Sequence, residues 1–197
     1  MRDKIWYMVL ILGVIASVFG GALAFVNAHT NEVLEVRTFN ETVLPTLNAV
    51  FRPYNPTNDF LKDKVKVRIG EDSMGRQQYA EIYFAKKGSD TLAMATIVNG
   101  RGYGGVFTIF VAADAKTHEI IATKTLQQKE TKSLGGRIAN EDEPFVKQFA
   151  GMRIEQNLSL KSEGGDVDGM SGATITSGAF TKAVKTAGEL FLSQKKK

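Results

Sequence analysis

The sequence predicts an α+β fold, in which a small antiparallel sheet with flanking helices follows a single N-terminal transmembrane helix. Three features support this prediction: an uncharged apolar segment near the N-terminus, several β-rich segments in the middle, and two helical segments after them. A run of strands followed by a run of helices is typical of α+β domains. The 197 residues, 43% of them hydrophobic, suffice for one domain core and an appendage.

The apolar segment covers residues 5–27, IWYMVLILGVIASVFGGALAFVN, and contains no charged residue. At ~1.5 Å rise per residue, a helix of this length spans about 34 Å, enough to cross the core of a bilayer. Arg2 and Lys4 precede it, so the positive-inside rule places residues 1–4 in the cytoplasm and the main domain outside. A cleaved signal peptide is the alternative, with Ala22-Leu23-Ala24 as its cleavage site. We favour a retained anchor because the apolar stretch exceeds a usual signal core.

Residues 28–60 are predicted to form a helical stalk and linker before an extracytoplasmic domain at 61–197. Apolar residues recur at intervals of three and four up to Phe51, which indicates a helix, and Pro45 is expected to interrupt it. The following segment, RPYNPTNDF, is polar and rich in turn residues.

Five β-rich segments separated by turn residues predict the sheet. They are residues 65–70, 77–88, 91–100, 105–114 and 119–128. In the first segment Val65, Val67 and Ile69 alternate with basic residues, so we expect one face of the sheet to be solvated.

Two helices are predicted after the sheet, at residues 143–152 and near the C-terminus, with a polar loop between them. The carboxylates of Glu141, Asp142 and Glu143 are suited to the start of the first helix. The final helix carries one apolar stripe at helical spacing, formed by Phe180, Val184, Ala187, Leu190 and Phe191.

The composition excludes several kinds of chemistry. The chain has no cysteine, which rules out disulfides, thiolate metal sites, cysteine-ligated iron–sulfur clusters and thiol catalysis. Redox chemistry would therefore need a bound organic cofactor or partner proteins. The net charge is +4, but the basic residues are scattered except for the cluster Lys195–Lys197. No motif for binding nucleic acid accompanies them, so we expect no nucleic-acid partner.

Two further features are given structural rather than chemical roles. GRGYGG, residues 100–105, fits the spacing of a dinucleotide-binding loop, but a β-rich segment follows it where that loop requires a helix. We therefore predict only a glycine-rich turn that allows close approach of a ligand. His29 and His118 lack companions at metal or catalytic-triad spacing, so we expect surface roles and no metal site.

The segment DGMSGATITS, residues 168–177, places two glycines and four hydroxyl side chains just before the final helix. One hydroxyl, from Ser171 or Ser177, would suffice to cap the helix. A helix start also offers unpaired N–H groups and a favourable dipole, which together can bind a phosphate. Capping and a phosphate-binding or modified site are both open from this chemistry alone.

The order D-G-x-S-G-A-T-x-T-S resembles the flavinylation signature of the FMN-binding domain family. The resemblance implies FMN bound covalently, with its phosphate esterified to Thr174 by a flavin transferase. Asp168 and Gly169 match the part of the motif that the transferase recognises. The neighbouring residues would contribute to cofactor binding, and they are Ser171, Gly172, Ala173, Thr176 and Ser177.

A second segment, ETKSLGG at residues 130–136, is similar to a loop that lies against the flavin in the same family. The matching residues are Glu130, Thr131, Leu134 and Gly135. Lys132 and Ser133 stand where the family has proline and glycine.

The whole chain is similar to the G subunits of Rnf complexes, which are ion-translocating ferredoxin:NAD oxidoreductases. This likeness implies an electron-transfer subunit without catalysis of its own, held in the membrane with polytopic and iron–sulfur subunits. One alternative is the related C subunit of the Na⁺-translocating NADH:quinone reductase, which is usually longer. Two others are a flavoprotein of a different extracytoplasmic chain and a membrane-tethered scaffold or binding module without cofactor.

Overall fold

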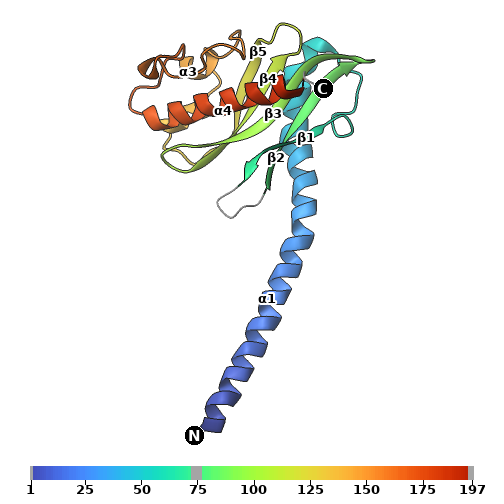
Figure 1. The fold of residues 1–197 in the computed structure, drawn as a ribbon, viewed down its shortest axis with the longest axis vertical. Helices are drawn as coiled ribbons and strands as arrows, with labels where there is room; N and C mark the ends of the chain where they lie inside the picture. Colours follow the sequence, from blue (N-terminus) through green and yellow to red (C-terminus); the bar gives the residue numbers. More distant parts are fainter. Residues whose placement is uncertain (1, 72–76, 195–197) are drawn as a thin grey trace. The chain divides into compact units, whose positions relative to one another are not determined.

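The computed structural model describes residues 2–71 and 77–194 (Figure 1), without the side chains of residues 2, 3, 28, 29 and 31–36. The terminal lysine cluster therefore lies outside the described residues. The chain divides into two compact units, Met1–Thr46 and Leu47–Lys197. The boundaries predicted from the sequence, at residues 28 and 61, remain predictions.

The described part of the N-terminal unit is helical throughout, and the chain stays helical up to Phe51, just inside the second unit. Helix α1 runs over Arg2–Thr38, a π-helical turn η1 over Phe39–Val43, and helix α2 over Leu44–Phe51. Within α1, Lys4–Asn27 is long and apolar enough to cross a membrane. The predicted interruption lies in the turn before Pro45, where the Leu44 N–H donates to the Phe39 carbonyl. A proline has no N–H to donate and its ring crowds the preceding turn, which explains the wider π-helical spacing there.

The sheet of the second unit contains the five predicted strands in sequence order, each antiparallel to its neighbour. They are β1 (Val65–Glu71), β2 (Gln77–Lys87), β3 (Asp90–Arg101), β4 (Val106–Asp114) and β5 (Ile120–Gln127). The fold class predicted from the sequence is therefore confirmed for this unit. The connection at 72–76 lies outside the described residues.

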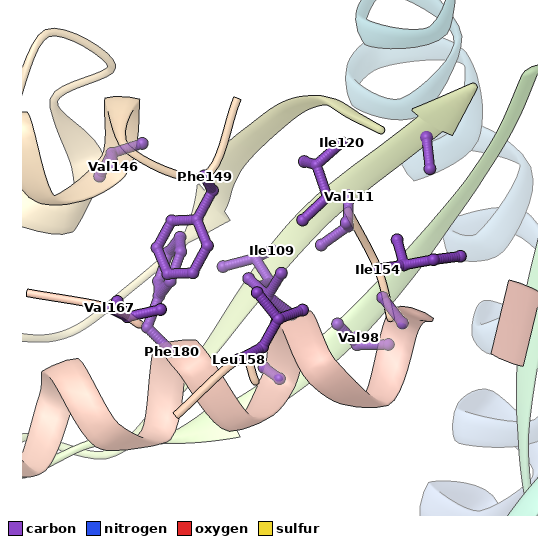
Figure 2. Close-up of a cluster of buried hydrophobic side chains, with 14 of the residues drawn as sticks. Val98, Ile109, Val111, Ile120, Val146, Phe149, Ile154, Leu158, Val167 and Phe180 are labelled. Carbon is purple, nitrogen blue, oxygen red and sulfur yellow. The ribbon is translucent and has the colours of Figure 1, made fainter. Parts of the chain in front are cut away.

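Helix α4 (Thr174–Gln194) packs against β3 and β4, and its predicted apolar stripe is buried. Phe180 lies at the centre of this core, with its ring centroid 5.4–6.1 Å from those of Phe107, Phe145 and Phe149. Figure 2 shows Phe149, Val167 and Leu158 gathered around Phe180 beside the sheet residues Ile109 and Val98. The core therefore fixes the start of α4 relative to β3 and β4.

The prediction of a solvated sheet face is wrong for the central strands. The side chains of Tyr83, Ala95 and Phe110 belong to the face opposite the α4 core, and each is buried. Strands buried on both faces contain continuous apolar runs, as in AMATIV of β3 and TIFVAA of β4. The edge strand β1 is more solvated, with Val65 and Ile69 about two-fifths exposed.

The polar linker after α2 completes the edge of β2. It begins with a 3₁₀ turn, η2 (Arg52–Tyr54). The Asn58 side chain accepts the Lys86 N–H at 2.7 Å and donates to the Phe84 carbonyl at 2.9 Å. Because β1 pairs with β2 only as far as Ile82, these backbone groups would otherwise lack a strand partner on that side.

The predicted helix at 143–152 is wrong beyond its first turn. Helix α3 covers only Pro144–Lys147. The chain then turns at Gly151, whose φ of +83° lies in the left-handed region. There the Gly151 N–H donates to the Ile120 carbonyl, and the Ile120 N–H donates to the Met152 carbonyl. Pairing with the start of β5 thus replaces the helical hydrogen bonds.

Two 3₁₀ turns lie in the segments between β5 and α4. They are η3 (Gly135–Ala139) and η4 (Lys161–Glu163). The predicted polar loop between α3 and α4 has buried anchors, because Leu158, Leu160 and Val167 belong to the core. These anchors hold the segment that leads into α4.

Candidate functional site

A pocket of about 470 Å³ lies where the β3–β4 turn, the 130–135 loop and the start of α4 come together. The sequence motifs predicted most of its lining residues. Those present in the lining are Glu130, Thr131, Leu134, Gly135, Gly172, Ala173, Thr174 and Thr176. Tyr103 and Ile175 also line the pocket and were not predicted. Ser171 and Ser177 do not line it.

The carboxylate of Glu130 joins three walls of this pocket. Its Oε1 accepts the Gly104 N–H of the β3–β4 turn at 2.9 Å, and its Oε2 accepts the Thr176 hydroxyl of α4 at 3.2 Å. Glu130 and Thr176 are 9% and 1% exposed. The Glu130 N–H donates to the Gln128 side chain, which orders the approach to the loop. Glu130 is therefore a buried brace rather than an open binding group.

Glycines make room for this carboxylate on two sides. A Cβ atom at Gly102 would lie 2.3 Å from Glu130 Oε1, and one at Gly135 would lie 2.5 Å from Oε2. The GRGYGG segment itself is a hairpin turn closed by the Gly102 N–H on the Gly105 carbonyl at 2.9 Å. Strand β4 follows it, as predicted, where a dinucleotide-binding loop would require a helix.

The 130–136 loop closes although Lys132 and Ser133 depart from the family pattern. The Thr131 carbonyl accepts the Leu134 N–H at 3.0 Å and the Gly136 N–H at 2.8 Å. Lys132 and Ser133 are exposed at the tip of this turn. A Cβ at Gly136 would lie 2.8 Å from the Thr131 carbonyl oxygen, so the second glycine of LGG is required for the closure.

Helix α4 begins with unpaired backbone donors. The first i−4 hydrogen bond runs from the Ser177 N–H to the Ala173 carbonyl, so the N–H groups of residues 174–176 have no intrahelical partner. Ala173 precedes the helix and has no side-chain oxygen for a cap. Ser177 lies inside the first turn, where its hydroxyl accepts the Met170 N–H and donates to the Ala173 carbonyl, both at 2.9 Å. Ser177 therefore does not cap the helix. Its two hydrogen bonds instead fold the preceding motif back onto the first turn of α4.

The two threonines of the motif have different surroundings. Thr174 is the first residue of α4 and is exposed. Its hydroxyl makes no hydrogen bond with any residue that the structure describes. The Thr176 hydroxyl is buried and bonded to Glu130. Of the two, only Thr174 presents an accessible oxygen.

Arg137 links the segment before α4 to the 130–136 loop, and the sequence motifs did not predict this residue. Its guanidinium donates to the Ser171 carbonyl at 2.8 Å and to the Leu134 carbonyl at 3.3 Å, and lies 3.3 Å from a Glu143 carboxylate oxygen. The only signal in the sequence is its position directly after the LGG glycines. Contacts so distant along the chain could not be inferred from spacing.

Asp168 is held so that its side chain faces solvent. The Gln148 side chain accepts the Asp168 N–H at 2.8 Å and donates to the Asp168 carbonyl at 2.9 Å. The carboxylate, whose side chain is 69% exposed, pairs with Lys161 at 2.7 Å. A Cβ at the neighbouring Gly169 would make only ordinary contacts. The predicted recognition residues thus lie outside the pocket on an accessible surface.

The expectation of a surface role for His118 is wrong. The residue lies in the β4–β5 turn with φ of +62°, is 8% exposed and contacts the Glu155 carboxylate. Burial alone would raise the pKa of Glu155, but the hydrogen bond from His118 holds it below its usual value. The side chain of His29 is not among those that the structure describes. Over residues 2–71 and 77–194 no group of acidic or histidine side chains is arranged to hold a metal.

Comparisons with known proteins identify the family. Residues 102–189, which include the pocket, match the family model of the FMN-binding domain. The G subunit of the ion-translocating oxidoreductase complex of Aliivibrio fischeri is 31% identical over 152 residues, covering 75% of this chain and 71% of that protein. The chain belongs to the family of these G subunits. The G subunit of the same complex from Stutzerimonas stutzeri is 29% identical over 190 residues, covering 94% of this chain and 80% of that protein.

Among solved structures, this member of the G subunit family is similar to the crystal structure of Shewanella oneidensis NqrC. The two are 16% identical, with a TM-score of 0.48, and the match covers 71% of this chain and 75% of that one.

Proposed function

We propose that this G subunit family member carries FMN esterified through its phosphate to the Thr174 hydroxyl, and that it transfers electrons within a membrane-bound, ion-translocating oxidoreductase complex. The observation that carries the proposal is the position of Thr174. It is the exposed first residue of α4 at the rim of the 470 Å³ pocket, inside a domain matched by the FMN-binding family. The relatives' name supplies the complex.

The start of α4 suits the phosphate. The N–H groups of residues 174–176 have no helical acceptor, and Thr174, which would carry the ester, is itself the first residue of the helix. The positive end of the helix dipole stabilises a negative group there by roughly 0.3–1 kcal/mol. These backbone groups would hold the phosphate without a cationic side chain.

The walls of the pocket suit a flat ring system. Tyr103, Ile175 and Leu134 are 84%, 60% and 48% exposed, which is unusual for large apolar side chains brought together at one site. A ring bound among them would cover this surface. FMN supplies reversible one- and two-electron transfer when bound, while the protein determines its position and surroundings.

The remaining side chains hold these walls in place. Glu130 braces the β3–β4 turn against α4, and Arg137 holds Leu134 and the Ser171 backbone. Gln148 holds the backbone of Asp168 in place. We assign Asp168 and the neighbouring Gly169 to the surface that the flavin transferase recognises. None of these groups is assigned a catalytic step, in keeping with a subunit that carries electrons between partners.

We assign residues 5–27, within the Lys4–Asn27 segment of α1, to a single membrane crossing, with residues 1–4 in the cytoplasm and the FMN-binding domain on the extracytoplasmic side. Its length and composition support the crossing, and the basic residues before it support the direction. The partners are then polytopic and iron–sulfur subunits, with Na⁺ or H⁺ moved by the complex.

The test is mass spectrometry of the chain produced together with a flavin transferase. The peptide containing Thr174 should be heavier by the mass of FMN less one water, and the colour should survive denaturation. Thr174→Ala should abolish the modification. Thr176→Ala removes only the buried hydroxyl, so this variant should still be modified at Thr174. Covalent flavin in Thr174→Ala, or colourless protein with an unmodified Thr174 peptide, would contradict the proposal.

A further inference from the structure

We propose that the groove along the exposed face of α4 is a second binding seat for the flavin ring tethered at Thr174. This inference rests on the proposed function, because it requires the ester at Thr174. The groove has a volume of about 620 Å³ and runs between α4 and the segment 158–163. Thr174 and Ile175 line both the groove and the 470 Å³ pocket. The attachment point is therefore on the shared rim of two cavities.

The floor of the groove begins at the attachment point. Thr174, Gly178, Lys182, Lys185 and Glu189 all line it and recur every three or four residues, so they form one face of the helix. At ~1.5 Å per residue, Lys182 lies about 12 Å along the axis from Thr174. A group attached to the Thr174 hydroxyl can therefore lie along this face of the helix.

The surface of the groove fits a flat heterocycle with polar edges. Gly178 has no side chain to fill the groove next to Thr174. A Cβ atom added there would have Leu160 Cδ1 as its nearest neighbour, at 3.7 Å. Farther along, the ammonium groups of Lys182 and Lys185 are exposed and make no ion pair with any described residue. They can donate to the carbonyl oxygens of the flavin ring, and the carboxylate of Glu163 on the facing wall can accept its imide N–H.

The two seats differ in what surrounds the ring. In the pocket the ring would contact walls lined by Tyr103 and Leu134, which the Glu130 brace holds in place. The groove places it on the solvent-facing side of α4. A ring that moves between them about a fixed ester meets electron donors and acceptors from two sides of the helix.

Quenching of flavin fluorescence by tryptophan tests the second seat. The chain contains one tryptophan, Trp6, which all variants share, so a difference between two variants reports the added tryptophan. Thr186→Trp places the quencher in the groove without removing Lys182, Lys185 or Glu163, and Lys116→Trp is the control. Lys116 is an exposed lysine beside Ala115, which shares a cavity with Phe191. Phe191 lies about 25 Å along α4 from Thr174.

The full chain, flavinylated by its transferase, should show a shortened component in the flavin fluorescence decay of Thr186→Trp that Lys116→Trp lacks. Adding Tyr103→Leu, which weakens the pocket, should increase the share of that component. Identical decays in the two tryptophan variants, with FMN present on the Thr174 peptide, would overturn the second seat and leave the proposed function standing. Absence of FMN from Thr174 would overturn both.

Discussion

The hydroxyl of Thr176 donates to the carboxylate of Glu130 across 46 residues of sequence, at 3.2 Å and with both side chains buried. The same carboxylate accepts the Gly104 N–H. One side chain thus determines how the 130–136 loop, the β3–β4 turn and the first turn of α4 fit together. The shape of the pocket around Thr174 depends on this arrangement.

Glu130→Ala should lower the free energy of unfolding by about 1–3 kcal/mol, because it leaves the Gly104 N–H and the Thr176 hydroxyl buried without a partner. Glu130→Gln should lose less, since the amide keeps an acceptor of the same shape. Urea unfolding of the full chain in detergent, followed by circular dichroism, measures both. Lys132→Ala in the exposed tip of the same loop is the control. Equal stability of Glu130→Ala and the control would contradict the brace.

Gly135→Ala should also destabilise the domain by about 1–3 kcal/mol, because the added Cβ would lie 2.5 Å from Glu130 Oε2 and 2.6 Å from Thr176 Oγ. Gly178→Ala is a matched control inside α4, where the nearest atom is 3.7 Å away. Alanine is favoured over glycine in a helix interior, so that variant should gain roughly 0.5–1 kcal/mol. Unfolding midpoints that shift in the same direction for both variants would contradict the steric argument.

Gln148→Ala should slow flavin attachment at Thr174, because Gln148 holds the backbone of Asp168 through two hydrogen bonds. A time course of covalent flavin fluorescence with added transferase and FAD measures the effect. Lys161→Ala removes only the exposed ion pair to the Asp168 carboxylate, and such pairs contribute ~0–1 kcal/mol. We expect this control to be modified at nearly the normal rate. A slow Lys161→Ala beside a normal Gln148→Ala would show that charge pairing, not backbone placement, governs recognition.

The contact between Tyr54 and Asp114 predicts a loss of stability at high pH. Burial and the hydrogen bond to Asp114, at 3.0 Å, raise the pKa of Tyr54 from 10.0 to about 12. A pKa raised by folding contributes stability that is complete below pH 10.0 and is lost as the pH rises toward about 12. Wild-type protein should therefore lose more stability over this range than Tyr54→Phe, which has no proton to release. Parallel losses in unfolding measurements across the same pH range would contradict the prediction.

The local pattern of the sequence determined the secondary structure of the sheet and the final helix. Alternating and continuous apolar runs located all five strands, and the stripe from Phe180 to Phe191 located the buried face of α4. The motif around Thr174 could be read because its residues are adjacent in the chain. Local patterns failed where a distant partner competed, as at Gly151, whose backbone pairs with Ile120 and ends the helix begun at Pro144.

What only the tertiary structure decided is which of the hydroxyls and carboxylates are available. Thr174 and Thr176 stand two residues apart in one motif, yet one is exposed and the other is buried against Glu130. The resemblance to the flavinylation signature pointed to Thr174, but residue type and spacing do not tell which hydroxyl is exposed, because exposure depends on which side of α4 faces the 130–136 loop. That orientation is set by the packing of Phe180 among the aromatic rings of the core, and the placement of Thr174 at the rim of two cavities follows from it.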